Sequence, residues 1–299
     1  MKLDFLTVWS RLTSDRIPHW IFYVILGVAI IVVAAVFDPK ATSDPAASPE
    51  DRAKEDLSRY VYPSMDGIRW KPHFVRPQDS LERLFGKDWI LVARFNRIDR
   101  RHVYPGMTIK VPENMDDIRD YHPLPEMLEK AKGHEKYILL SGTEQWLAAY
   151  KYGRRVLSMP AATGIEGHLT PTGLFRVSAY HRKHTSSLYK THKGDAQYPM
   201  DHAILFHVDK AQVLYWIHAR DLPGRPASHG CVGVFDEAMQ HRVYGVPDNP
   251  VLDDAKKLYV WTIGEELFAQ DNGTHQPLPN GPPLEIVGEL PKRLPHPPK

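Results

Sequence analysis

One cysteine stands among residue types that suit covalent chemistry. Cys231 is the only cysteine in the chain, in the stretch GRPASHGCVGV between Gly230 and Gly233. A free thiol with a pKa of about 8.5 is mostly protonated at neutral pH and needs a base to act as a nucleophile. Two histidines are close in sequence, His218 in IHAR and His229 next to Gly230. Glycines let backbone N–H groups approach a reacting carbonyl, so the pattern predicts acyl transfer through a thioester.

Two other roles for Cys231 stay open at this point. A single cysteine often packs as a small hydrophobic side chain, although this one lies between glycines rather than in an apolar run. Zinc could be held by His218, His229 and Cys231, but that set has one thiolate and no further patterned ligand. An internal disulfide, and any site built on paired cysteines, is excluded by the cysteine count.

The residues around this site read as strands joined by turns. YILLSG and then QWLAAYKYGRRVLSMPAATG show alternating stretches with a turn at Gly153. In HLTPTGLFRVSAY, the residues from Thr170 to Gly173 predict a stiff turn that leads into a strand. ILFHV and VLYWIHA predict short strands, and DEAMQHRVYG is the best helix candidate. A β-rich domain therefore carries the cysteine.

A smaller layered unit precedes this domain, over residues 73–112. HFVRP predicts a strand, and Ser80 is placed to cap a helix whose Leu81 and Leu84 share one face. A second apolar helix ends at Asn96, and YPGMTIKVP predicts a turn and a final strand. With its opening VRPQDSL and its closing YPGMTIKVP, this segment resembles a LysM module. The resemblance implies binding of N-acetylglucosamine-containing glycan, usually peptidoglycan.

The stretch from Trp20 to Phe37 is apolar and carries no charge. As a helix it would span about 27 Å at about 1.5 Å per residue, close to a hydrocarbon core. A cleaved signal peptide and a buried core helix are the alternatives, but signal cores are shorter and core helices seldom stay apolar on every face. Basic residues precede the stretch and acidic residues follow it. This bias predicts a cytoplasmic N-terminus and an exported remainder.

The composition bounds what else the chain does. Lys and Arg total 38 and Asp and Glu total 36, so no basic field points to nucleic acid. DPKATSDPAASPEDRAKE has the composition of a linker, and the proline-rich residues after His275 predict an extended or disordered tail.

The cysteine domain as a whole resembles the L,D-transpeptidases, cysteine enzymes that remodel peptidoglycan. The resemblance rests on AATG, TPTG, the Ile-His pair of IHAR and, above all, SHGC. It implies that Cys231 is the nucleophile and His218 the general base. His229 becomes a second site histidine, and Ser228, Gly230 and Gly233 become residues of the oxyanion loop. The N–H groups of Gly230 and Cys231 are the implied oxyanion donors, and no cofactor or metal is implied.

Three positions depart from the family pattern. Gly233 stands where Arg or Asn is usual, Ala219 stands where Gly is usual, and the gap from His218 to Ser228 is short. The missing Arg could bind a substrate carboxylate through two parallel hydrogen bonds. We expect Arg220 or Arg225, which follow His218, to supply that charge; a solvated loop charge is the alternative for each.

The resemblance implies peptidoglycan glycan and stem peptides as partners. Cys231 would release D-alanine from a tetrapeptide stem, and an amine of another stem or of a lipoprotein would take the acyl group. Hydrolysis, cleavage of existing links, and a non-catalytic wall-binding protein remain alternatives. We expect a single-pass protein of the inner membrane with a periplasmic catalytic domain.

The predicted fold class is α+β and multidomain, with a βααβ module and a sandwich-like catalytic domain of few helices. The predicted divisions are a cytoplasmic N-terminus over 1–19, a transmembrane anchor over 20–37, a linker over 38–72, the LysM-like module over 73–112, a connector over 113–134, the catalytic domain over 135–264 and a proline-rich tail over 265–299.

Overall fold

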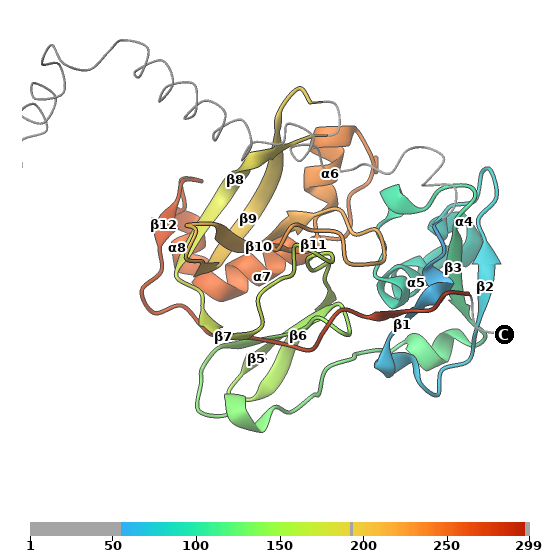
Figure 1. Ribbon diagram of the computed structural model, residues 1–299, viewed down its shortest axis with the longest axis horizontal. Coiled ribbons are helices and arrows are strands. Elements are labelled where there is room, and N and C mark those ends of the chain that lie inside the picture. Colours follow the sequence, from blue (N-terminus) through green and yellow to red (C-terminus); the bar gives the residue numbers. More distant parts are fainter. Residues whose placement is uncertain (1–54, 192–193, 297–299) are drawn as a thin grey trace, which may run out of the picture. The chain divides into compact units, whose positions relative to one another are not determined.

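The computed structural model describes residues 55–191 and 194–296 (Figure 1). The predicted anchor over 20–37 lies outside the described residues. Among those that are described, no helix has the length and apolar character needed to cross a membrane. The described chain falls into two compact units. The described residues of the smaller unit are 188–191 and 194–196. In it, the Thr191 hydroxyl donates a hydrogen bond of 2.7 Å to Asp195.

Two five-stranded sheets form the part of the larger unit that carries the cysteine (Figure 1). The first sheet has the strand order β11-β10-β9-β8-β12, and the second has the order β6-β5-β4-β13-β7. Their bounds are β4 Tyr137–Ser141, β5 Trp146–Lys151, β6 Arg154–Pro160, β7 Gly173–Arg176, β8 Ala179–Lys190, β9 Gln197–Val208, β10 Leu214–Arg220, β11 Val232–Phe235, β12 Gln276–Pro277 and β13 Pro283–Val287.

The main hydrophobic core is shared by these two sheets. Ile217 of β10 and Val232 of β11 pack in the same buried cluster as Ile138 and Leu140 of β4. Because side chains alternate along a strand, His218 and Arg220 of β10 lie on the opposite face. The catalytic domain is thus β-rich with few helices, as predicted.

The predicted turn at Gly153 is a two-residue hairpin between β5 and β6. Tyr152 and Gly153 both have positive φ angles, 48° and 79°. This is the backbone conformation of tight hairpins whose twist matches that of the flanking strands.

Three helices accompany the sheets, and the sequence predicted one of them. That helix is α6, Glu237–Tyr244, which begins where Asp236 accepts a hydrogen bond from the Met239 N–H. α7 spans Asp254–Ile263 and α8 spans Glu265–Gln270. Leu258 and Tyr259 of α7 pack into the main core, which stabilises a segment rich in β-forming residues as a helix.

The prediction of a separate tail over 265–299 was wrong. β13 lies inside the second sheet, parallel to β4 and antiparallel to β7. Leu284 and Ile286 are 0% and 2% exposed. A strand of this sheet, rather than a solvated chain, begins at Pro283, directly after Pro282.

The N-terminal module, residues 55–112, contains the predicted strand, two helices and strand. β2 (Trp70–Phe74) pairs antiparallel with β3 (Thr108–Pro112), and α4 (Leu81–Phe85) and α5 (Trp89–Asn96) lie between them in sequence. Ser80 caps α4 by accepting the Arg83 N–H at 3.2 Å. Asn96 bonds the backbone of Lys110 in both directions, which ties α5 to β3. The likeness to LysM stays a prediction.

The linker predicted over 38–72 is folded in its described part. The 3-10 turns η1 (Leu57–Arg59) and η2 (Pro63–Met65) flank β1 (Tyr60–Val61), which pairs with β14 (Lys292–Arg293). Leu57 and Tyr62 are each 1% exposed and belong to the module's core. Burial of these apolar side chains stabilises a folded conformation here, although the residues before them have the composition of a linker.

Candidate active site

Parallel strands β10 and β11 bring the two predicted catalytic residues together. His218 pairs with Gly233, and Cys231 directly precedes β11. Since Ile217 and Val232 face the core, Cys231, Gly233 and His218 lie on the other face of the sheet. Cys231 and His218 are thus diagonal neighbours on one face.

The tautomer of His218 follows from its hydrogen bond. Its Nδ1 lies 2.7 Å from the carbonyl oxygen of Ala219, which can only accept, so Nδ1 carries the proton. Nε2 is then left with a lone pair, as a general base requires. Burial, together with the nearby charge of Arg220, lowers the pKa of His218 to about 3. The imidazole is therefore neutral at physiological pH.

Cys231 is partly exposed, and its Sγ lies 3.9 Å from the Leu214 carbonyl oxygen. Burial raises the pKa of the Cys231 thiol, while a hydrogen bond from the Trp216 backbone and the charge of Arg220 oppose that rise. The resting site thus holds a neutral thiol and a neutral imidazole.

Ser228 orders the SHGC loop from inside. It is 1% exposed, its hydroxyl donates to the Cys231 carbonyl oxygen, and it accepts the Gly230 N–H at 3.1 Å. Gly230 has φ 113°, and a Cβ there would lie 2.7 Å from the Tyr215 ring. Glycine is required at 230 for both reasons. Because the Gly230 N–H is bonded within the loop, its role as an oxyanion donor stays a prediction, as does that of Cys231.

The AATG segment, residues 161–164, supports the same loop. Ala162 and Gly233 exchange backbone hydrogen bonds of 2.9 Å, and Thr163 O accepts the Ser228 N–H at 3.0 Å. Gln145, fully buried, donates 2.6 Å to the Thr163 hydroxyl and accepts the Thr163 N–H at 2.9 Å. Sequence reasoning missed Gln145; a polar residue directly before a predicted buried strand was the only signal.

The histidines of the domain differ in their placement. The His229 ring lies 4.9 Å from the ring of His168, edge to face. The ring centre of His184 lies 4.5 Å from that of Trp216, the neighbour of Cys231 across the strands. Burial, with the nearby His181 and His275, lowers the pKa of His184 to about 4.

Two further histidines lie outside this group. His202 hydrogen-bonds Asp236 at 2.9 Å, and the His207 ring lies 5.5 Å from the Tyr215 ring. Over residues 55–191 and 194–296, no three His, Cys, Asp or Glu side chains are grouped so that they could hold one metal ion.

The two predicted substrate-binding arginines have different surroundings. Arg220 is 9% exposed, lies over Gly233, and donates 2.7 Å to the Ala227 carbonyl oxygen. Its charge reaches both His218 and Cys231. Arg225 instead forms an ion pair of 2.8 Å with Glu55 of the N-terminal module. The structure thus places Arg220 beside the candidate site, and binding of substrate by either arginine stays a prediction.

Comparison with solved structures finds the L,D-transpeptidases. L,D-transpeptidase 1 of Mycobacterium tuberculosis is 18% identical, with 51% of this chain and 62% of that one covered and a TM-score of 0.31. An L,D-transpeptidase of Xylanimonas cellulosilytica is 20% identical, with 66% and 78% covered and a TM-score of 0.39. One of Stackebrandtia nassauensis is 18% identical, with 70% of each chain covered and a TM-score of 0.35.

The chain spans less than two thirds of the Mycobacterium tuberculosis protein. No curated protein matches it. Residues 135–263 match the family model YkuD, described as the L,D-transpeptidase catalytic domain. Because β10, β11 and the loop between them lie in that range, the candidate site falls inside the region that is similar to this family model.

Proposed function

We propose that the chain is a peptidoglycan L,D-transpeptidase that acts through a Cys231 acyl-enzyme. One observation carries the proposal: the β10–β11 register sets His218, with its Nε2 able to accept a proton, diagonally next to Cys231 on one sheet face. That pair lies inside the YkuD match. A nucleophile and a base on adjacent strands suit acyl transfer without a cofactor.

The first step releases D-alanine from a tetrapeptide stem. Cys231 Sγ attacks the carbonyl carbon between the L-configured and D-configured centres, and its proton passes to His218 Nε2. The C–N bond of the tetrahedral intermediate then breaks, and His218 returns the proton to the departing D-alanine amine. A thioester on Cys231 remains. The loop N–H groups of Gly230 and Cys231 are the proposed donors to the oxyanion.

The second step consumes the thioester. An acceptor amine, from a neighbouring stem or a lipoprotein lysine, attacks the same carbonyl, loses a proton to His218 Nε2, and forms an amide. The C–S bond breaks, and the thiolate recovers the proton. With water as the acceptor in place of the amine, the enzyme acts as a carboxypeptidase. When the same reaction runs in reverse on an existing link, the enzyme cleaves that link.

The remaining assignments follow the resemblances of the sequence. The N-terminal module would bind glycan, and the apolar stretch over 20–37 would anchor the chain in the inner membrane with the catalytic domain outside. An anchor and a weak binder together raise the concentration of stems near Cys231.

The test is incubation of the full chain, in detergent, with disaccharide-tetrapeptides and mass spectrometry of the products. Cys231→Ala and His218→Gln are the variants, and Arg242→Ala, at an exposed ion pair with Asp201, is the matched control. D-alanine release that needs both Cys231 and His218 is expected. Cross-linked dimers or shortened stems then identify the acceptor.

Glycan binding without any product that depends on Cys231 would overturn the enzyme and leave a wall-binding protein. Release that survives in Cys231→Ala would overturn the acyl-enzyme.

A further inference from the structure

A six-residue loop, 221–226, joins the strand of His218 to the segment of Cys231. It leaves β10 just after Arg220 and reaches Ser228 two residues after Pro226. The loop is therefore continuous in sequence with both the His218 strand and the SHGC segment. The contacts that hold residues 221–226 therefore bear on the position of the Cys231 thiol relative to the His218 imidazole.

The first half of the loop is held by Asp99, which lies after α5 in the N-terminal module. Asp99 is fully buried, and its Oδ2 accepts the Leu222 N–H at 2.7 Å and the Gln240 side-chain N–H at 2.8 Å. The Asp99 N–H donates to the Leu222 carbonyl oxygen at 2.9 Å. Ile98 forms a β-bridge with Pro223. Both backbone polar groups of Leu222 are thus satisfied by one residue of the module.

The second half of the loop is held by residues near the start of the module. The Tyr62 hydroxyl donates to the Gly224 carbonyl oxygen at 3.0 Å, a buried bond. Leu57 packs so closely that a Cβ on Gly224 would lie 3.0 Å from its Cδ2. Glu55 pairs with Arg225 at 2.8 Å. The loop therefore has its polar contacts with the module at both ends.

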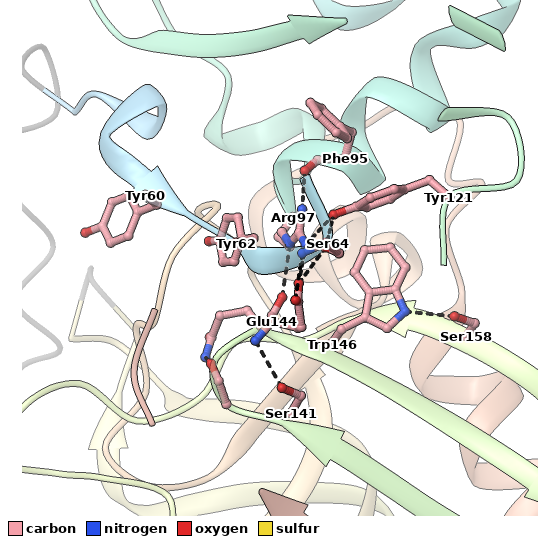
Figure 2. Close-up of polar contacts among 12 residues, drawn as sticks. Tyr60, Tyr62, Ser64, Phe95, Arg97, Tyr121, Ser141, Glu144, Trp146 and Ser158 are labelled. Carbon is pink, nitrogen blue, oxygen red and sulfur yellow. Dashed lines mark hydrogen bonds and ion pairs between the residues drawn. The ribbon is translucent and has the colours of Figure 1, made fainter. Parts of the chain in front are cut away.

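Tyr62 is itself fixed to the catalytic domain. The Arg97 guanidinium lies 3.9 Å from the Tyr62 ring centre and 5.2 Å from that of Trp146, on β5 (Figure 2). Arg97 Nε donates at 3.1 Å to the carbonyl oxygen of Glu144, two residues before β5. The Arg97 side chain has no exposure. The module is thus fastened to the second sheet while it holds the loop of the first.

We propose that the N-terminal module positions the catalytic loop, with Asp99 and Tyr62 as positioning residues for the Cys231–His218 pair. The proposal rests on the proposed function for its rate measurements, but not for its measurement of thiol reactivity. Neither residue touches the reacting atoms; both act through Leu222 and Gly224. The module is then needed for turnover even on a soluble stem peptide that carries no glycan.

The test compares Tyr62→Phe with Tyr150→Phe in the full chain. Each change removes one hydroxyl that donates to a backbone carbonyl, on Gly224 at 3.0 Å or on Pro125 at 2.9 Å, from a buried tyrosine. Phenylalanine keeps the ring and its contact with Arg97. The two variants are expected to lose similar thermal stability. A difference in activity or thiol reactivity between the two variants therefore reports on the contact between Tyr62 and the loop.

Three readouts are taken: melting temperature, kcat and KM for D-alanine release, and the pH profile of alkylation by iodoacetamide. Because the chain has one cysteine, alkylation reports on Cys231 alone. Tyr62→Phe is expected to lower kcat roughly ten-fold with KM within about two-fold, as for a displaced reacting group. Its alkylation midpoint should move toward that of a free thiol, at about 8.5. Tyr150→Phe should change neither.

Asp99→Asn is the second variant, since it keeps the shape of the side chain and replaces one acceptor oxygen with a donor. The same changes as in Tyr62→Phe, but larger, are expected. Should Asp99→Asn fail to fold, Tyr62→Phe decides alone. Equal kcat and equal alkylation profiles in Tyr62→Phe and Tyr150→Phe would overturn the proposal. If the unaltered chain releases no D-alanine, the proposed function fails, and the alkylation profiles still decide the positioning.

Discussion

The side chain of Arg220 occupies the space that any side chain at Gly233 would need. A Cβ on Gly233 would lie 2.5 Å from Arg220 Cβ and 2.9 Å from its Cγ. The two residues stand on adjacent parallel strands, two positions apart in register, because Gly233 pairs with His218. A cation near Cys231 is thus supplied by β10, and a side chain at position 233 of β11 would displace it.

Gly233→Ala is expected to destabilise the fold by about 1–3 kcal/mol, because overpacking displaces Arg220. Arg220→Ala in the same chain should restore part of that loss. Denaturant unfolding of both single variants and of the double variant measures the coupling. Strictly additive effects would show that the two side chains do not compete for this space.

If Arg220 binds the substrate carboxylate through a charge-assisted hydrogen bond, Arg220→Ala is expected to raise KM for the tetrapeptide stem at least ten-fold. Steady-state kinetics of D-alanine release measures it. Arg242→Ala, which removes an exposed arginine, should leave KM unchanged. An unchanged KM in Arg220→Ala, with a raised KM in Arg225→Ala, would move the substrate contact to Arg225.

Acid should destabilise the protein through His218. Its pKa is lowered by burial to about 3 in the folded chain and is about 6.5 in the unfolded chain. The unfolded state therefore binds the proton first as the pH falls. The contribution of neutral His218 to stability is therefore complete above about pH 6.5. Below that, the free energy of unfolding declines by about 1.4 kcal/mol per pH unit until about pH 3.

Denaturant unfolding between pH 7 and 4 measures this slope, and His218→Gln is the matched variant. The free energy of unfolding should fall less steeply in His218→Gln than in the unaltered chain. Parallel curves for the two proteins would contradict a neutral, buried His218.

Local signals in the sequence were enough for several elements. The Ser80 cap of α4, the hairpin at Gly153 and the start of α6 at Asp236 each depend on residues within a few positions. The pairing of SHGC with an upstream histidine also predicted the neighbours His218 and Cys231, because strands fix both ends of the short loop.

Other features depend on contacts far apart in sequence. β13 looked like a tail because prolines surround it, yet its partners are β4 and β7. The place of His184 beside Trp216 follows from strand order, which alternation alone does not specify. Residues 57–72 follow a segment with the composition of a linker. Local sequence did not show that side chains such as Leu57 and Tyr62 are buried in the core of the N-terminal module.

Leu284→Ala is expected to cost about 2–5 kcal/mol of unfolding free energy, because Leu284 is fully buried in β13. Leu174→Ala, on the neighbouring β7 and 71% exposed, makes the same chemical change at the surface. It should stay within about 0.5 kcal/mol. Thermal or denaturant unfolding compares them, and equal losses would argue that β13 is not an interior strand.

The position of β13 also sets the order in which the enzyme can be completed. β4 and β7 are neighbours in one sheet only through β13, so the sheet remains in two pieces while residues 283–287 are still to be synthesised. Cys231 and His218 have by then already emerged. Long-range strand pairing of this kind is slow to form. The nascent chain thus carries Cys231 before its second sheet is complete, and the free edges of β4 and β7 are the surfaces that a chaperone would have to shield in that interval.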